Sequence, residues 1–356
     1  MQPSKLGFGA MRLPSSAAER NKMFDAYLNG GGNYIDTAYA YAGSEEALKG
    51  ALTSRRPRDS YFLANKMPPW SVNNIKDCER IFKESLKRCG VDYFDFYLLH
   101  SMTVENERIA VSVGMYEWAA KMKKEGHVRR VGFSFHDSPE TLEKMLNAHP
   151  EMDFVMLQLN YADVLRGNSG ALHKIAHERN MHIIGMEPIR GGTLANLPEK
   201  AEAVFKKYRP GSTPSEWALR YARSLPGVVT VLSGMSNMTQ LEENLKTFNP
   251  FEPITEADLP VYEEVLVELS KYANIPCTGC RYCVADCPKD IQIPDNIMLY
   301  NDLMRGAPKW NRQQMYLAIH SGRRAEDCIA CGKCLNHCPQ NINIPEALEL
   351  VKKELS

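Results

Sequence analysis

Eight of the ten cysteines lie between residues 277 and 338, at a spacing that could hold metal. Cys277, Cys280, Cys283 and Cys287 form a C-x2-C-x2-C-x3-C run before a proline, and Cys328, Cys331, Cys334 and Cys338 form a second run. Three cysteines at three-residue intervals wrap one loop around an iron–sulfur cubane, while the fourth points toward the neighbouring cluster. Zinc sites usually separate their cysteine pairs by longer gaps. The spacing therefore favours two 4Fe-4S clusters over two zinc knuckles or a disulfide cluster.

The two cysteine runs belong to a longer repeat, since each cysteine of the second run lies 51 residues after its counterpart. The tails also match, with Ile291-Gln-Ile293-Pro294 against Ile342-Asn-Ile344-Pro345. Residues 275–346 resemble the two-cluster bacterial ferredoxin family. That resemblance implies exchanged fourth ligands: Cys277, Cys280, Cys283 and Cys338 for one cluster, and Cys328, Cys331, Cys334 and Cys287 for the other. Helix-like stretches at 295–305 and 311–320 predict a helical variant of that module.

Cys78 and Cys89 lie outside these runs, eleven residues apart on a predicted helix. That separation is about 16 Å along a helix axis, which is too far for a disulfide. We expect both to be buried thiols that pack in the core.

Four polar residues near the ends of three apolar runs could carry acid–base chemistry. Asp36, Lys66 and His100 each end such a run, and Tyr41 follows Asp36 by five residues. A lone buried charge is costly, whereas Lys66 and Asp36 can neutralise each other. A neighbouring ammonium favours phenolate, so we expect the pKa of Tyr41 to fall toward neutral pH. Tyr41 would then be a general acid for a carbonyl oxygen whose carbon receives a hydride, with His100 orienting that carbonyl.

Three of the four residues have a simpler interpretation when each is taken alone. Asp36 could cap a loop, Tyr41 could pack in the core, and His100 could be a structural histidine. Their combination at successive strand ends is more specific, because the carboxyl ends of barrel strands meet at one mouth.

The elements that would position these residues alternate between strand and helix over the first 250 residues. Eight apolar runs with β propensity are separated by amphipathic helical patterns. The runs are 6–11, 34–37, 61–66, 94–99, 130–135, 154–159, 182–186 and 228–233. Ser44, Ser138 and Thr213 give helix-start signals. We predict an α/β fold in which a closed (β/α)8 TIM barrel precedes a small, mainly helical iron–sulfur domain. An open doubly wound sheet is disfavoured, because Gly7-Phe-Gly9 lacks the third glycine of a dinucleotide turn.

Several stretches of the predicted barrel resemble the aldo-keto reductase family. They are Leu6–Arg12, Asp36 with Tyr41–Glu45, Asn65-Lys66, Leu98–His100, Val131–Ser134, Leu157–Asn160 and Glu242–Asn244. The resemblance implies a catalytic tetrad of Asp36, Tyr41, Lys66 and His100, and hydride transfer from NADPH or NADH to an aldehyde or ketone. It also implies a set of cofactor-binding residues. These are Gly9, Ala10, Met11, Ser134, Gln158, Met186, Arg190, Gly234, Ser236, Gln240, Glu243 and Asn244.

Some residues depart from the pattern of that family. Met186 replaces the aromatic residue that stacks on the nicotinamide, and Phe135 replaces the Asn that often follows Ser134. Gly234 and Gln240 lie where members that prefer NADP carry basic residues, although a phosphate is best bound by Arg or Lys. NAD and NADP therefore both remain candidates. The long connection 187–213 after the seventh strand, with Arg190-Gly-Gly-Thr193, is a candidate cofactor lid.

Composition and charge disfavour some classes of binding partner. Its 43 basic and 43 acidic side chains balance, which disfavours a nucleic-acid or membrane-surface protein. No apolar run is long enough to span a bilayer, and no basic-then-apolar leader begins the sequence. We therefore expect a cytoplasmic protein. Its predicted segments are a barrel (1–254), a connecting helix (255–273) and a ferredoxin-like domain (274–356).

Fusing a hydride-transfer barrel to iron–sulfur clusters leaves three functional hypotheses, because nicotinamide moves two electrons together and each cluster moves one. The first is a carbonyl reductase whose clusters exchange electrons with a carrier protein. The second is an electron-transfer protein whose barrel binds nucleotide or a partner without turnover. The third is a reductase in which the clusters are structural. The tetrad favours the first over the second.

Overall fold

The computed structural model describes residues 2–272, 275–277, 281, 283–284, 286–338 and 340–356. Cys280 is outside this set. The chain forms two compact units. The first contains residues 1–188 and 218–254, and the second contains residues 189–217 and 255–356. The second unit therefore combines the C-terminal region with most of the connection that follows the seventh strand.

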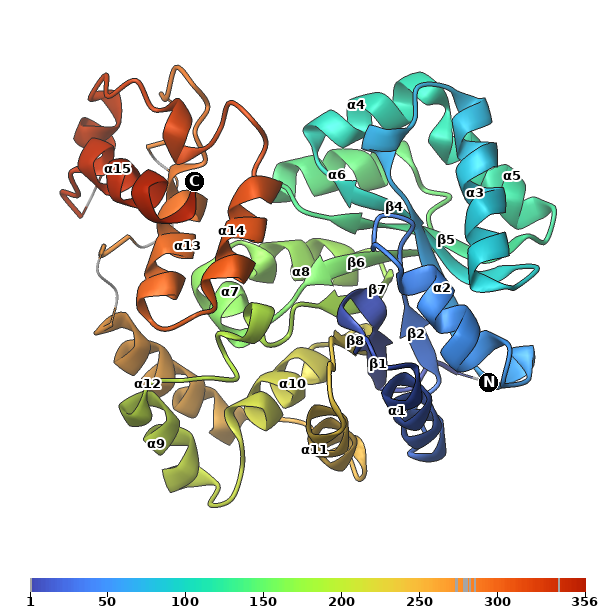
Figure 1. The fold of residues 1–356 in the computed structure, drawn as a ribbon. Helices are drawn as coiled ribbons and strands as arrows, with labels where there is room; N and C mark the ends of the chain where they lie inside the picture. Colours follow the sequence, from blue (N-terminus) through green and yellow to red (C-terminus); the bar gives the residue numbers. More distant parts are fainter. Residues whose placement is uncertain (1, 273–274, 278–280, 282, 285, 339) are drawn as a thin grey trace. The chain divides into compact units, whose positions relative to one another are not determined.

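The first unit is built on eight parallel strands in sequential order that close into a barrel (Figure 1). The strands are β1 (Leu6–Gly9), β2 (Tyr34–Asp36), β3 (Phe62–Met67), β4 (Phe94–Met102), β5 (Val128–Phe135), β6 (Phe154–Gln158), β7 (His182–Met186) and β8 (Val228–Ser233). The pairing of β1 with β8, at Phe8 against Ser233, closes the ring. The predicted TIM barrel is thus confirmed, and no Gly-rich dinucleotide turn follows β1.

Helices follow the strands, as the amphipathic patterns predict. They are α1 (Ala17–Asn29), α2 (Ser44–Leu48), α3 (Ile75–Cys89), α4 (Val104–Val113), α5 (Met115–Lys124), α6 (Pro139–Ala148), α7 (Tyr161–Arg166), α8 (Ser169–Glu178), α10 (Pro214–Ser224) and α11 (Met238–Phe248). The continuous pattern over 105–125 is interrupted at Gly114, which takes a left-handed φ of 78° and separates α4 from α5. The short helix α7 is too brief to give a periodic signal.

Two of the three predicted helix-start residues cap a helix. Ser138 accepts the amide of Thr141, and Thr213 accepts the amide of Glu216. Ser44 instead donates to the carbonyl of Ala10 at 2.8 Å, so its hydroxyl ties the start of α2 to the turn after β1. A cap residue and a tertiary contact residue look alike in sequence, because both need only a short hydroxyl.

The barrel interior is filled by side chains from neighbouring strands, which makes it a packed core. This cluster consists of Tyr34, Ala64, Phe96, Leu98, Phe154, Met156, Ile184 and Leu232, with Phe62, Met186 and Val229 packed against it. Cys78 and Cys89 are both buried, as expected of core thiols.

The second unit contains helices α9 (Glu199–Tyr208), α12 (Leu259–Ser270), α13 (Ile293–Met304), α14 (Lys309–Ala318) and α15 (Ile344–Leu355). The repeated Ile-Pro pairs begin α13 and α15, where proline fits because the first helical amides need no partner in the helix. Both helices contribute to one apolar core with Ile275, Ile291 and Tyr316. Around α12, the ring of Phe205 stacks on Trp217 at 4.7 Å, and Tyr262 meets both edge-on. None of the helices described in this structure is both long and apolar enough to cross a membrane.

Close strand packing at Gly132 gives a test of the barrel. A Cβ atom there would lie 2.3 Å from the backbone oxygen of Phe154 on the neighbouring strand. Because backbone cannot move aside cheaply, we expect Gly132→Ala to lower the free energy of unfolding by about 2 kcal/mol or more. Urea unfolding followed by tryptophan fluorescence would measure this loss. Gly50→Ala is the matched control, because its Cβ would meet nothing within 4 Å, and equal midpoints for the two variants would contradict the packing argument.

Candidate active site and cysteine cavities

The four residues at the strand ends come together at one end of the barrel. The ammonium of Lys66 lies 2.5 Å from Oδ1 of Asp36, 2.8 Å from the carbonyl oxygen of Thr37 and 3.3 Å from the hydroxyl of Tyr41. The Tyr41 ring meets the His100 ring edge-on at 5.7 Å between centroids. The predicted residues therefore form one continuous set of contacts.

Strand register explains this convergence. Asp36 on β2 pairs with Ala64 on β3, and Lys66 lies two residues further along β3 and pairs with Leu98 on β4. Residues two apart on a strand face the same side. Lys66 therefore shares the inner face of β3 with Ala64, and His100 shares that of β4 with Leu98, one layer beyond the apolar core. Tyr41 comes from the loop after β2, whose end is placed by the Ser44 contact with Ala10.

Lys66 is a buried cation, since only 1% of its side chain is exposed. Burial alone would lower the pKa of Lys66, but the charge of Asp36 and hydrogen bonds to Asp36 and Tyr41 outweigh it and raise that pKa. Lys66 is therefore an ammonium at neutral pH. Asp36 is 4% exposed, so each charge is neutralised by the other rather than by water.

The expectation that the pKa of Tyr41 falls toward neutral pH is wrong. Burial raises the pKa of Tyr41 above its usual value, and the nearby Lys66 ammonium only partly offsets this effect. The charges of Asp36 and Glu187 raise it further. Desolvation of a phenolate, which sequence spacing does not reveal, decides the direction. The phenol is therefore protonated at neutral pH, which is the state that a proton donor requires.

His100 is neutral, because burial and the Lys66 charge hold its pKa well below the usual value. Its Nδ1 atom is buried, and none of the described residues hydrogen-bonds to it. Trp70, half exposed, lies 5.2 Å from the His100 ring. Sequence analysis did not identify Trp70. Its position in the loop directly after the strand that carries Lys66 could have indicated a role at the site.

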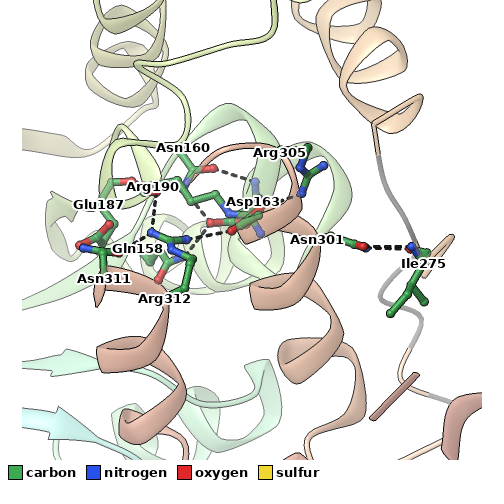
Figure 2. Close-up of polar contacts among 11 residues, drawn as sticks. Gln158, Asn160, Asp163, Glu187, Arg190, Ile275, Asn301, Arg305, Asn311 and Arg312 are labelled. Carbon is green, nitrogen blue, oxygen red and sulfur yellow. Dashed lines mark hydrogen bonds and ion pairs between the residues drawn. The ribbon is translucent and has the colours of Figure 1, made fainter. Parts of the chain in front are cut away.

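The residues predicted to hold the nicotinamide lie at the ends of β5 and β6. Ser134 is buried, and its hydroxyl oxygen accepts the amide of Ser101 at 2.7 Å, which leaves its proton available to donate. The side-chain amide of Gln158 donates to Asp163 at 2.6 Å, and Asn160 donates to the same carboxylate oxygen at 2.7 Å (Figure 2). Asn160 and Asp163 fix the orientation of Gln158, and sequence analysis had not assigned Asp163 any role.

The residues predicted to hold the adenosine half lie at the end of β8 and the start of α11. Gln240 accepts both the amide and the hydroxyl of Ser236, and Asn244 donates to Ser233 at 2.9 Å. Glu243 is exposed. One unpredicted residue joins this group. A Cβ atom on Gly234 would lie 3.9 Å from a guanidinium nitrogen of Arg12. The turn after β1 thus brings a cation to the end of β8, where the local sequence has none.

The remaining predicted cofactor residues lie at the ends of β1 and β7. Gly9 pairs with Asp36, buried Ala10 accepts the Ser44 hydroxyl, and Met11 is exposed. Met186 packs against the barrel core from the end of β7. Arg190 belongs to the second unit, where its guanidinium lies 3.3 Å from the carboxylate of Asp302 on α13. Their roles toward a cofactor stay predictions.

The described cysteines of the two runs line two separate cavities in the second unit. One is lined by Cys287 together with Cys328, Cys331 and Cys334, and the other by Cys338 together with Cys277 and Cys283. Cys287 therefore lies with the three cysteines of the second run, and Cys338 lies with the two described cysteines of the first, while Cys280 is outside the described residues. The assignment of these thiols to clusters stays a prediction. Apolar residues such as Ile291 and Ile293 complete the walls. Thiols around an apolar cavity fit an iron–sulfur cubane.

Comparison with known proteins finds a matching family for each of the two regions of the chain. The aldo/keto reductase family matches residues 5–266, and a 4Fe-4S dicluster domain matches residues 276–342. An aldo-keto reductase from Mycolicibacterium paratuberculosis is 28% identical over 247 residues, which is 68% of this chain and 80% of that protein. The uncharacterized oxidoreductase YqkF from Bacillus subtilis is 23% identical over 279 residues, 69% of this chain and 87% of that protein.

Solved structures show the same fold. Aldo-keto reductase AKR11C1 from Bacillus halodurans superposes with a TM-score of 0.63 at 24% identity, over 73% of this chain and 91% of that chain. An aldo-keto reductase from Klebsiella pneumoniae in complex with NADPH superposes with a TM-score of 0.62 at 21% identity, over 73% and 90%.

The buried ion pair at the barrel mouth predicts a large stability effect. In Asp36→Asn the Lys66 charge loses its neutralising partner inside the protein, so we expect unfolding free energy to fall by about 3–5 kcal/mol. Urea unfolding at neutral pH measures the change. Asp25→Asn is the control: Asp25 pairs with Arg55 and Arg56 but is 32% exposed, so its loss should cost under about 1 kcal/mol. Similar losses in both variants would refute the claim that burial makes the Lys66 pair special.

Proposed function

Because this chain belongs to the aldo/keto reductase family, we propose that its barrel reduces an aldehyde or ketone with NADPH or NADH. The observation that carries this proposal is the contact of the Lys66 ammonium with both Asp36 and the Tyr41 hydroxyl at the barrel mouth. A barrel that only bound a ligand would gain nothing from a buried cation beside a protonated phenol.

The chain's own residues would supply the proton for this reaction. When bound, the nicotinamide cofactor supplies a hydride to the carbonyl carbon. Tyr41 gives its phenolic proton to the carbonyl oxygen, which yields the alcohol, and water later reprotonates the phenolate. Lys66, 3.3 Å from that hydroxyl, stabilises the negative charge that develops on Tyr41. Asp36 keeps Lys66 charged and in place.

Neutral His100 would orient the substrate. An uncharged imidazole beside the phenol can form a hydrogen bond with the carbonyl oxygen without competing for the proton that Tyr41 delivers. The half-exposed Trp70 ring next to His100 offers an apolar wall for the substrate.

The groups at the strand ends fit a nicotinamide nucleotide. The Ser134 proton and the side chain of Gln158 would hold the carboxamide, while Ser236, Gln240 and Asn244 would bind the adenosine half. Arg12, beside Gly234, supplies the positive charge that a phosphate requires. This position supports NADP, and one structural relative is described in complex with NADPH.

The second unit would hold two 4Fe-4S clusters, with Cys280 as the remaining ligand of the first. Such clusters supply one-electron chemistry when bound. The cavity of the second run opens near exposed residues, since Cys331 is exposed and Ile329 and Leu335 are 58% and 41% exposed. This exposure favours electron exchange with a carrier protein over a purely structural role.

Tyr41→Phe tests the proposed reduction. Loss of the phenolic proton should lower kcat for a carbonyl panel by about 100-fold or more, while NADPH binding and iron content stay unchanged. Tyr39→Phe is the matched control, because the Tyr39 hydroxyl instead donates to Glu84 at 2.8 Å. Anaerobic assays of NADPH oxidation measure kcat for both variants. Full turnover in Tyr41→Phe would remove Tyr41 from the mechanism.

Exchanged ligation predicts which cluster each cysteine holds. Cys338→Ser should lose the cluster bound by Cys277 and Cys283 and keep the other, so anaerobically reconstituted protein should retain about half of its iron and sulfide. Cys78→Ser, a buried thiol outside both runs, should keep all of it. A zinc content, or wild-type iron in Cys338→Ser, would contradict the assignment.

A further inference from the structure

Helix α13 carries two buried asparagines, and each of them holds the backbone that leads into one cysteine run. Asn301 is 5% exposed and Asn296 is fully buried. A side-chain amide is costly to bury unless its donor and acceptor are hydrogen-bonded. Both asparagines meet this requirement with backbone groups of the loops just before the cysteines, and these contacts all lie within the second unit.

Asn301 holds a residue that precedes the first run. It donates to the carbonyl oxygen of Ile275 at 2.7 Å and accepts the amide of Ile275 at 3.0 Å (Figure 2). The same carbonyl oxygen accepts the amide of Cys277 at 2.8 Å. Ile275 therefore links Asn301 to the first cysteine of this run, which lines one of the two cavities.

Asn296 makes the corresponding contacts before the second run. Its side-chain oxygen accepts the amide of Ala325 at 2.9 Å, and its side-chain nitrogen donates to the carbonyl oxygen of Arg323 at 3.3 Å. The carbonyl oxygen of Ala325 accepts the amide of Cys328 at 3.2 Å, and Cys328 lines the other cavity. In both runs, the residue whose amide is held by an asparagine gives its carbonyl oxygen to the first cysteine.

The internal repeat of 51 residues does not account for this pair. The positions on α15 that correspond to Asn296 and Asn301 are Ala347 and Lys352. Neither an alanine nor a lysine side chain can both donate and accept, as an asparagine amide does. One helix, which lies between the two runs in the sequence, therefore holds the segment before the first run and the segment before the second.

We propose that Asn301 and Asn296 are positioning residues for two separate iron–sulfur clusters, and that each fixes the first thiolate of one run. Groups that hold metal ligands in place contribute about 10–100-fold to metal affinity. Because each asparagine contacts a different run, its loss weakens the cluster of that run and spares the other. This inference rests on the proposal that the second unit holds two 4Fe-4S clusters.

Asn301→Ala and Asn296→Ala in the full-length, anaerobically reconstituted protein test the proposal. To read one cluster at a time, each variant is combined with Cys334→Ala, which removes a thiol of the second run, or with Cys283→Ala, which removes one of the first. In the Cys334→Ala protein, Asn301→Ala should speed iron release to a chelator about tenfold, while Asn296→Ala leaves the rate within about twofold. In the Cys283→Ala protein, the two asparagine variants should exchange these effects. Loss of the visible cluster absorbance measures the rate.

Backbone exchange tests the positioning contact itself. With all cysteines intact, hydrogen exchange read by mass spectrometry should show faster deuterium uptake in a peptide that contains Ile275 in Asn301→Ala. In Asn296→Ala, the faster uptake should instead occur in a peptide that contains Ala325. Each asparagine variant is thus a control for the other.

A further control separates these effects from general damage to the second unit. Asn343→Ala removes an asparagine whose side chain donates to Glu346 in an exposed contact, and it should change none of these readings. If an alanine variant fails to fold, Asn301→Asp and Asn296→Asp replace only the amide donor, keep the shape of the side chain and are judged by the same readings.

The outcomes are distinguishable from those of the cluster proposal. Equal acceleration of iron release from both clusters, or unchanged release in both asparagine variants, overturns the inference. Faster release without the matching change in deuterium uptake overturns it as well. Wild-type protein that binds zinc, or no iron, would refute the cluster proposal and this inference with it, whereas wild-type protein with two intact clusters whose asparagine variants behave alike refutes the inference alone.

Discussion

The active end of the barrel depends on one constraint, the cost of keeping the Lys66 ammonium away from water. Only a paired and hydrogen-bonded charge is tolerated in that position. Asp36 supplies the pair, the Thr37 carbonyl supplies a further acceptor, and the Tyr41 hydroxyl completes the set. The geometry of the proposed proton donation thus follows from the requirement for charge compensation, and the ends of β2 and β3 must stay in register to meet it.

Burial at this site acts on all of the ionisable groups, with different consequences. It keeps the Tyr41 phenol protonated and the His100 imidazole neutral, whereas Lys66 keeps its charge because Asp36 is in contact. A protonated phenol, a neutral imidazole and a fixed cation are therefore distinguished by their immediate neighbours. This arrangement supports the proposed transfer of a proton from Tyr41 to a developing alkoxide.

The second unit also contains a buried charge that is neutralised by its neighbours. Asp302 is a buried anion surrounded by arginines, and it lies on the helix whose first turn lines both cysteine cavities. The connection after β7 is grouped with this unit rather than with the barrel from which it extends. Residues 189–217, which follow a barrel strand in the sequence, therefore belong to the same compact unit as the two cysteine runs.

The sequence by itself determined the strand count and the closed barrel, because hydrophobic period and residue spacing are local properties that tertiary contacts only reinforce. It also identified Asp36, Tyr41, Lys66 and His100, since equivalent strand ends meet at one mouth. It could not determine the direction of the Tyr41 pKa shift, which depends on how completely water is excluded. Nor could it place Arg12 beside Gly234, or Asp302 beside Arg190, residues separated by over 100 positions. Those pairings arise when β1 closes against β8 and α13 packs in its unit, and only the tertiary structure decides such contacts.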